Sequence, residues 1–379
     1  MSFQLNEIQE LIQQNTRDFA KEYIEPIAGQ TDKENSFPQK VVEQLAGNDY
    51  FGLFLPEEFG GSEAGYLSFV LAVEEMAKVS AGVAAILINQ SALAGYALNK
   101  WGTPDQKKSY LSSLITGEKL GAFALAEPGA APGAGPNKLT AVKDGGDYIL
   151  NGRKSYVANG GQADFYLVFG VTDEEDPSRR MSSFIIETQT PGFSVTRTIG
   201  KMGQRACPWA ELSFENVRVT AGQLLGNEGE GSIIAQEAKA VANVAEGALV
   251  IGVAQAGMEE AANYAKQRIQ FGQPIANFPA IRNMLAEMST NIHLARLAVY
   301  DAANMIEQGK NIFTEAAMIK LFVSRIGQNS LIDAVQVHGG YGFSEDMVVS
   351  RYYRDVKGSL LIDGSADLPE SFIAADLLD

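Results

Sequence analysis

The side chains that many enzymes use for chemistry are scarce in this chain. It has two histidines, His293 and His338, and a single cysteine, Cys207, among 379 residues. One cysteine cannot form an internal disulfide, and this set cannot supply a His-rich or Cys-rich metal cluster. Zinc enzymes, Cys-His hydrolases and disulfide scaffolds are therefore disfavoured, and we expect no bound metal. His338 precedes Gly339 at an expected helix end, which favours a capping or packing role over general base.

Phosphate-binding and nucleophile motifs are also missing. No stretch matches G-x-x-x-x-G-K-[ST] or G-x-S-x-G, and the nearest approaches to G-x-G-x-x-G, at Gly133, Gly229 and Gly340, lack the third glycine. Glycine-rich loops at 127–129, 226–231 and 339–342 permit close approach of a flat or phosphorylated ligand, although each alone is explained as a turn. Residue chemistry by itself therefore predicts a ligand cleft without specifying its ligand.

Composition limits the partners. The 30 Lys+Arg and 46 Asp+Glu give a net charge of −16, which disfavours nucleic acid and anionic membrane surfaces. A hydrophobic content of 46% in 379 residues predicts a large core and two or three domains. The N-terminus has no basic patch followed by an apolar segment, and the purely apolar runs are too short to span a membrane. We expect a soluble cytosolic protein without membrane insertion.

Helical periodicity dominates both ends of the chain. Apolar residues at helical spacing run from Leu5 to Pro26, where the helix is expected to stop, and the same period returns at 41–45, 66–79 and 106–114. In the segment 66–79, Glu74 and Glu75 are expected on the face opposite the apolar stripe. Long helices are predicted after the loop GNEGEG, at 232–268, 280–309, 314–337 and 366–378.

Between the helical regions, from Gly121, the sequence has short β-branched and aromatic segments. Asp144-Gly145 and Asn151-Gly152 are expected turns between successive antiparallel strands. The fold class is therefore α+β, with an N-terminal α-helical domain at 1–118, a barrel-like antiparallel β-domain at 119–228 and a C-terminal helical bundle at 229–379.

In order, the loops and their flanks resemble the acyl-CoA dehydrogenase family of flavoproteins over about 370 residues. The similar segments are LPEEFGGSEAGYLSFVLAVEEMAKVSAG, GTPDQKK, FALAEPGA, LNGRKSYVANG, GKMGQRACPWAELSFENVRV, NYAKQRIQFGQPI, QVHGGYGF and RYYRDVK. Each motif is loose, but their shared order and spacing are specific.

The resemblance implies a fold, a cofactor and a reaction. The fold would be a helical domain, a β-domain and a C-terminal four-helix bundle, assembled as a dimer of dimers. The cofactor would be FAD, the substrate an acyl-CoA thioester, and the electron acceptor an electron-transferring flavoprotein. In the family's reaction a carboxylate removes the α-proton of the thioester while the β-hydride goes to flavin N5.

The resemblance also assigns site residues by position. The residues expected around the flavin ring come from two segments of the β-domain. Other residues match family positions that contact the FAD pyrophosphate or adenine, or that lie beside the cofactor near the C-terminus. The cofactor residues are Phe123, Leu125, Ala126, Tyr156, Val157, Ala158, Arg268, Phe271, Gln336, Gly339, Gly340, Ser365 and Asp367. Arg268 and Phe271 match residues that reach across a dimer.

Departures from the family pattern fall on the catalytic base. The common tail motif I-Y-E-G-T is LIDGS here, so Asp363 is the candidate base and the Gly364 amide would help hold the thioester oxygen. Relatives that place the base on the long helix have it at the position of Ala242, which cannot serve. Glu246 lies one turn on and is the alternative base, with a polar pocket residue as the competing interpretation. Asn243 replaces the arginine common beside that position.

Other departures concern the flavin and the substrate. Ala126 and Ala158 replace two threonines that bond the flavin, Tyr156 replaces a tryptophan, and Pro132 replaces a serine expected near the CoA arm. The aspartate at the base position resembles members that act on alicyclic thioesters such as cyclohexanecarboxyl-CoA. Three alternatives stay open: an enoyl-CoA reductase running the reaction in reverse, an acyl-CoA oxidase, and a non-catalytic CoA-thioester-binding member.

Overall fold

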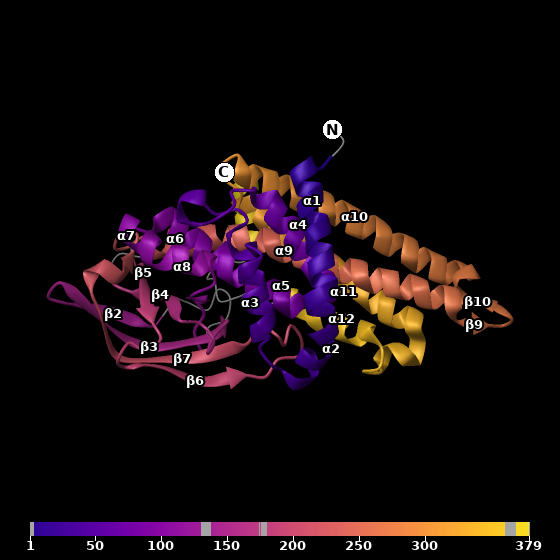
Figure 1. Ribbon diagram of the computed structural model, residues 1–379, viewed down its shortest axis with the longest axis horizontal. Helices are drawn as coiled ribbons and strands as arrows, with labels where there is room; N and C mark the ends of the chain where they lie inside the picture. The colour runs from indigo at the N-terminus through magenta and orange to yellow at the C-terminus, as the bar shows by residue number, and fades with distance from the viewer. Residues whose placement is uncertain (1–3, 130–137, 174, 176–179, 361–368, 379) are drawn as a thin grey trace.

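A computed structural model describes residues 4–129, 138–173, 175, 180–360 and 369–378. Helices from both ends of the chain lie side by side, and the strands form a sheet beside them (Figure 1). The predicted α+β order of helices, strands and helices is confirmed.

The N-terminal part is helical throughout. Its elements are α1 (Glu7–Phe19), η1 (Ala20–Ile24), α2 (Glu25–Glu34), α3 (Gln39–Gly47), η2 (Tyr50–Gly52), η3 (Glu57–Phe59), α4 (Tyr66–Val79), α5 (Ala81–Leu87), η4 (Ile88–Gly95), α6 (Tyr96–Trp101), α7 (Pro104–Gln106), η5 (Lys107–Leu111) and α8 (Ser112–Ile115). A capping box between Asn6 and Gln9 starts α1, because each side chain accepts a bond from the other's backbone N–H.

The expected helix end at Pro26 is wrong. The chain passes through the π-helical turn η1 and continues as α2 to Glu34, with the proline in the first turn of α2. A proline is tolerated there because a first-turn N–H needs no helical partner, and the wider π turn absorbs the change in hydrogen bonding. Helix α2 ends where Asn35 takes a left-handed conformation, with φ of 53°.

The expected solvent-facing position of Glu74 and Glu75 is also wrong. Both carboxylates are buried, at 1% and 2% exposure. Glu74 accepts from the Arg296 guanidinium and from the Tyr300 hydroxyl at 2.9 Å. Glu75 pairs with Arg17 of α1 at 3.2 Å as well as with Lys78 at 2.8 Å. Partners distant in sequence make this burial tolerable, so the local pattern could not reveal it.

The strands form one mixed sheet. They are β1 (Gly121–Ala124), β2 (Thr140–Asp144), β3 (Asp147–Ala158), β4 (Phe165–Val171), β5 (Met181–Glu187), β6 (Phe193–Ile199), β7 (Trp209–Val219) and β8 (Leu224–Leu225). Their order is β6-β7-β3-β2-β4-β5-β8, with β1 beside β4. Most pairs are antiparallel as predicted, but β1 and β2 both pair with β4 in parallel, which corrects the purely antiparallel expectation.

One of the two expected turns is present. Asp144 pairs with Asp147 across the β2–β3 hairpin, where Gly145 has a φ of +67°. Asn151-Gly152 is not a turn, because it lies inside β3 at a register shift against β7, with Gly152 at φ +145°. A glycine can occupy a β-bulge within a strand as readily as a turn, so the Asn151-Gly152 pair was wrongly predicted to be a turn.

The C-terminal part is again helical. Its elements are α9 (Gly231–Gln267), the hairpin strands β9 (Ile269–Gln270) and β10 (Gln273–Pro274), η7 (Ile275–Asn277), α10 (Pro279–Glu307), α11 (Phe313–His338), η8 (Gly339–Phe343), α12 (Val348–Lys357), η9 (Gly358–Leu360) and α13 (Pro369–Leu378). The sequence predicts α9, α10, α11 and α13 but not α12. The domain boundaries after residues 118 and 228 stay predictions.

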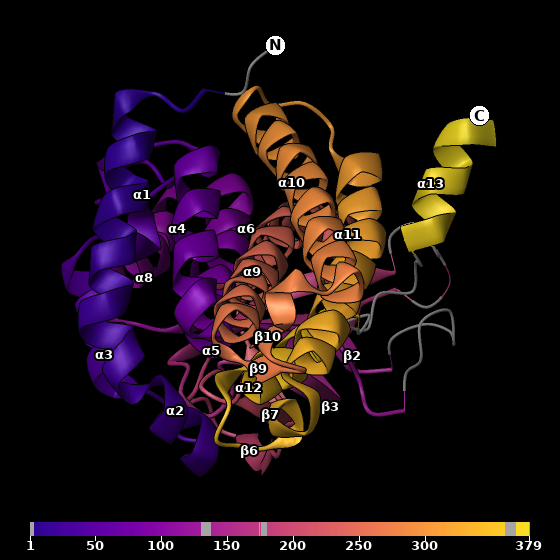
Figure 2. The ribbon, with the colours of Figure 1, turned by 90° about the vertical axis from the view of Figure 1, so that its right-hand side faces the viewer.

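Helix α9 is the central helix of the molecule. It packs against α4, α10 and α11, as the end-on view shows (Figure 2). Small residues allow the close contact, because a Cβ at Gly252 would lie 2.3 Å from the Glu74 carbonyl oxygen. By length and composition α9 and the segment 81–101 could each cross a membrane, but 78% and 89% of their apolar windows are buried inside the protein. They are core helices, as in a soluble protein.

Candidate active site

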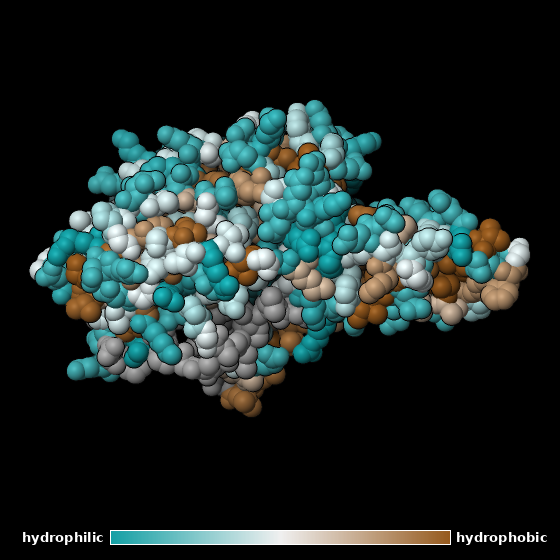
Figure 3. All heavy atoms as spheres, turned by 90° about the horizontal axis from the view of Figure 1, so that it is seen from below, coloured by the Kyte–Doolittle hydropathy of each residue, from teal (hydrophilic) through white to brown (hydrophobic). Residues whose placement is uncertain are grey.

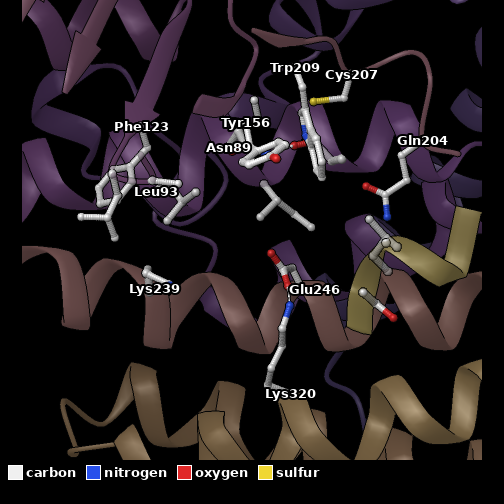
Figure 4. Close-up of a pocket in the computed structure, with 18 of the residues that line it drawn as sticks. Asn89, Leu93, Phe123, Tyr156, Gln204, Cys207, Trp209, Lys239, Glu246 and Lys320 are labelled. Atoms are coloured by element: carbon white, nitrogen blue, oxygen red, sulfur yellow. Dashed lines mark hydrogen bonds and ion pairs between the residues drawn. The ribbon is translucent and has the colours of Figure 1, made fainter. Parts of the chain in front are cut away.

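A cavity of about 480 Å³ lies where the β-domain meets the helices. Its walls come from the N-terminal helices, β1, β3, the start of β7, α9, α11 and the chain after α12 (Figure 4). The lining residues are Ala85, Ile88, Asn89, Leu93, Phe123, Leu125, Ala126, Ser155, Tyr156, Ala158, Gln204, Cys207, Trp209, Lys239, Glu246, Leu249, Lys320, Gly358 and Ser359. Such a volume is typical of a small-molecule site.

Six of the residues proposed from the sequence meet in this cavity. Five come from the two segments expected around the flavin, and the sixth is the alternative base. They are Phe123, Leu125, Ala126, Tyr156, Ala158 and Glu246. The segments lie about 30 positions apart in the sequence but adjoin in space, because the Ser155 amide donates to the Ala126 carbonyl oxygen at 2.9 Å.

Tyr156 is aimed at the cavity by a bulge in β3. The register between β3 and β7 shifts between Lys154 and Val157, and Tyr156 takes a left-handed conformation with φ of 57°. Tyr156 is 54% exposed, and its ring meets Trp209 edge-on, with ring centroids 5.8 Å apart. Val157 instead points into the core of the β-domain and is 1% exposed. A non-glycine residue in this conformation is typical of a functional site.

A buried ion pair fixes the cavity wall from behind. Lys154 is fully buried and donates to Glu127 Oε1 at 2.8 Å and to the Leu125 carbonyl oxygen at 2.9 Å. The Glu127 carboxylate also accepts from the amides of Lys138 and Leu139. Burial lowers the pKa of Lys154 to about 8, and Glu127 opposes that fall. The pair thus ties the Leu125-to-Glu127 turn to β3.

The loop before β7 closes another side. Lys201 donates to the carbonyl oxygens of Gln204 and Cys207 and lies 4.9 Å from the Trp209 ring centroid. The Gln204 amide donates to the buried Asp355 carboxylate of α12. Burial raises the pKa of the Cys207 thiol, so this cavity residue is a protonated, unreactive thiol.

The helix wall carries the cavity's charged groups. Glu246 on α9 pairs with Lys320 on α11, with Glu246 Oε2 2.7 Å from Lys320 Nζ. Lys239 on α9, 8% exposed, is the second lysine of the lining. Asn89 faces the same space from η4 (Figure 4). Asn89, Lys239 and Lys320 line the cavity but were not predicted from the sequence. Lys239 and Glu246 lie about two turns apart on α9, and this spacing could have indicated that both charges face the same side of the helix.

Several proposed residues lie elsewhere. Asn243, proposed as a substrate residue, is partly exposed but does not line the cavity. Five others fall outside the described residues, namely Pro132, Asp363, Gly364, Ser365 and Asp367. The five residues proposed for the nucleotide side are all exposed and gather near the far end of the helical part; they are Arg268, Phe271, Gln336, Gly339 and Gly340.

At that far end, two segments that are distant in sequence lie next to each other. The Arg268 guanidinium lies 5.8 Å from the ring centroid of Tyr341 in η8, which joins the β9–β10 hairpin to the loop after α11. Phe271 at the hairpin tip is 93% exposed, and apolar atoms are visible on this narrow end (Figure 3). The hairpin projects away from the β-domain (Figure 1).

Comparisons with known proteins identify the family. Family models describing the N-terminal, middle and C-terminal domains of acyl-CoA dehydrogenase match residues 6–118, 122–217 and 229–378. The chain therefore belongs to the acyl-CoA dehydrogenase family.

Individual relatives match over nearly their full length. A 3-(aryl)acrylate reductase of Clostridium sporogenes is 39% identical over 370 residues, covering 97% of this chain and 98% of the relative. The CarC subunit of the caffeyl-CoA reductase-Etf complex of Acetobacterium woodii is 36% identical, covering 98% and 99%. The solved butyryl-CoA dehydrogenase of Megasphaera elsdenii has a TM-score of 0.96 and 35% identity, covering 100% of both chains.

Proposed function

We propose that the cavity is where this chain carries out the α,β-dehydrogenation of an acyl-CoA thioester with FAD. The observation that carries the proposal is the meeting of the expected flavin-ring residues with the charged face of α9 in one cavity. The family's members are FAD-dependent oxidoreductases acting on CH–CH bonds, which supports the reaction class.

The cavity fits a planar cofactor. The Tyr156 ring is half exposed beside Trp209, and small side chains at Ala126 and Ala158 leave the wall open to a flat ring. When bound, FAD supplies the two-electron acceptor that takes up the β-hydride. Arg268, Phe271, Gln336, Gly339 and Gly340 would hold its nucleotide side from a second subunit, since they lie on the exposed end of the molecule.

We assign proton transfer to Asp363 and not to Glu246. Gly358 and Ser359 line the cavity, and Asp363 follows Ser359 by four residues. The Glu246 carboxylate already accepts a short bond from Lys320, and a proton-abstracting role would require that pair to open. The apolar wall of Ile88, Leu93 and Leu249 would exclude water from the α-carbon.

A second candidate is the reverse reaction, reduction of an enoyl-CoA. Ala126 and Ala158 stand where hydroxyl side chains bond the flavin in the family, and losing these donors disfavours the reduced, electron-rich cofactor. Electrons would then pass more readily to an enoyl thioester. Two of the relatives reported above are themselves named reductases, of 3-(aryl)acrylate and of caffeyl-CoA.

The partners follow from the same relatives. The CarC relative belongs to an Etf complex, so an electron-transferring flavoprotein is the proposed redox partner. We further propose a dimer of dimers in the cytoplasm, since the exposed hairpin end needs a second subunit to complete the cofactor site. The experiment below also tests an alicyclic acyl-CoA as substrate.

The test is a purified protein examined for flavin absorption. We expect bound FAD whose visible band bleaches anaerobically with a saturated aliphatic or alicyclic acyl-CoA, or whose reduced form is reoxidised by an enoyl-CoA. A colourless protein, or a flavin unaffected by every thioester in both directions, would establish the non-catalytic alternative. Peroxide release in air would instead identify an oxidase.

A further inference from the structure

A salt bridge on the helix wall faces the cavity and has no part in the proton and hydride transfers proposed above. Glu246 and Lys320 come from α9 and α11, and the carboxylate reaches toward the space enclosed by Asn89, Tyr156 and Trp209 (Figure 4). The two members differ in access, because the Glu246 side chain is 32% exposed and that of Lys320 only 10%. The carboxylate is therefore the member presented to a ligand.

The Glu246 carboxylate has acceptor capacity to spare. Within the described part of the chain, Lys320 is the one side chain that donates to it, through Oε2 at 2.7 Å. A carboxylate offers about four lone-pair positions, so Oε1 can accept further bonds. If an alkyl chain filled the cavity, it would displace water from this oxygen and supply no donor, which costs free energy.

The paired carboxylate favours a neutral donor. Lys320 already donates to Glu246 Oε2. An ammonium group would bring a further charge out of water, which costs more free energy than burying a hydroxyl does. A carboxylate placed at Oε1 would meet a like charge, whereas a hydroxyl can donate without adding charge.

From this geometry we propose that Glu246, held by Lys320, binds a hydroxyl group on the acyl chain of the substrate. The preferred substrates are hydroxylated acyl-CoA thioesters, and the salt bridge is a specificity element. The inference rests on the proposed function, since it places the acyl group in this cavity. A site built to bond a hydroxyl rejects the analogue that lacks it, because its own polar atom is left unpaired.

The experiment compares matched thioesters on the FAD-loaded protein. Each straight-chain acyl-CoA from four to eight carbons is paired with its ω-hydroxy and ω-carboxy counterparts. Dissociation constants come from titration calorimetry, and turnover comes from flavin bleaching. At the chain length that reaches Glu246, we expect the hydroxy compound to bind about 10- to 100-fold more tightly than its parent.

Two variants locate the effect. The double variant Glu246→Leu/Lys320→Leu removes both charges of this pair together and replaces them with apolar side chains. We expect it to lose the hydroxyl preference and to bind the parent acyl-CoAs more tightly. The control is Glu237→Ala, which removes a similar α9 ion pair, to Lys100 at 2.8 Å, outside the cavity lining. It should keep the wild-type preference.

The outcomes separate this inference from the proposed function. Equal affinity for hydroxy and parent compounds at every length would overturn the inference, as would tighter binding of the carboxy series or an unchanged preference in the double variant. Binding without bleaching by any thioester or reoxidation by any enoyl-CoA would overturn the proposed function alone, because calorimetry reads the hydroxyl preference independently of turnover.

Discussion

Lys154 is a fully buried cation that two groups of the Leu125-to-Glu127 turn compensate. Its ammonium donates to Glu127 and to the Leu125 carbonyl oxygen, directly behind the cavity wall. Removing one member of a buried pair leaves the other charge uncompensated in a region of low polarity. The free energy of unfolding therefore depends strongly on keeping both members or neither.

We accordingly expect Lys154→Met to lower the free energy of unfolding by about 3 to 5 kcal/mol. The double variant Lys154→Met/Glu127→Gln should recover much of that loss, because no buried charge is left alone. Denaturant unfolding of the three proteins measures both effects. Equal destabilisation by the single and double variants would show that packing, not charge compensation, dominates here.

Ala158 allows a test of the flavin's electronic environment. In Ala158→Thr the new hydroxyl would donate to the flavin and stabilise its reduced form by about 0.5 to 1.5 kcal/mol. For a two-electron couple this raises the midpoint potential by roughly 10 to 30 mV. Dye-equilibration titration gives the potential directly. An unchanged potential with FAD fully bound would mean that the residue at this position does not contact the cofactor.

Substitution of each candidate base in turn shows which of the two accepts the proton. Asp363→Asn cannot accept a proton, so kcat should fall by about 10²-fold to 10⁴-fold while FAD stays bound. Glu246→Gln should instead act mainly on substrate affinity, since we assign that residue to binding. Rapid-reaction measurement of flavin bleaching reports the chemical step. Near-normal bleaching in Asp363→Asn together with none in Glu246→Gln would place the base on α9.

At the scale of elements, local patterns predicted what local physics controls. The periods of α4, α9, α10 and α11 and the Asp144-Gly145 turn are confirmed because apolar spacing and turn chemistry act over a few residues. Burial of Glu74, by contrast, depends on Arg296 and Tyr300, more than 200 positions away. The bulge that aims Tyr156 depends equally on pairing with β7, which no local pattern contains.

The same limit applies to the site. Phe123 and Tyr156 could be assigned together only through the resemblance to a family, because their two segments meet through tertiary contacts. Lys320 shows the remaining gap, since an isolated lysine on a helix is normally a solvated residue. Only the packing of α11 against α9 reveals that it meets Glu246 at the cavity.

Helix α12 carries a buried carboxylate and a neighbouring arginine that together join it to two other parts of the chain. Asp355 accepts from the Gln204 amide of the β-domain loop, while Arg354 beside it pairs with Asp32 of α2. Burial raises the pKa of Asp355 to about 6 from its usual 3.8, and the Gln204 hydrogen bond opposes that rise. Between these two values the folded protein holds a proton that the unfolded chain has released.

This difference predicts the direction of a pH effect. The contribution of Asp355 to the free energy of unfolding should fall as pH rises from about 4 to 6, by up to roughly 3 kcal/mol, and stay constant above pH 6. Asp355→Asn removes the titration, so its stability relative to wild type should be greater at pH 7 than at pH 4. Urea unfolding at the two pH values tests this. A difference that does not change with pH would refute the assignment.

At the scale of the whole molecule, the cavity and the residues proposed for the nucleotide side lie at different ends. Arg268, Phe271 and the loop after α11 are exposed, and the β9–β10 hairpin projects away from the β-domain (Figure 1). The cavity, by contrast, is lined by residues of β1, β3 and β7. One chain cannot bring such separated residues to one cofactor without a partner. A second subunit can do so, and its docking would also cover the 93% exposed side chain of Phe271.

Loss of the Arg268 guanidinium should therefore weaken FAD binding through the assembly. A charge-assisted bond to the pyrophosphate is worth about 1.5 to 3 kcal/mol, so Arg268→Ala should raise the dissociation constant of FAD about 10- to 100-fold. The control is Arg197→Ala, which removes another exposed arginine from β6, where its surface pair with Glu211 contributes little. Flavin fluorescence on dilution measures cofactor release, and light scattering measures assembly. Wild-type FAD retention in Arg268→Ala, or a monomeric FAD-loaded protein, would mean that each chain completes its own cofactor site.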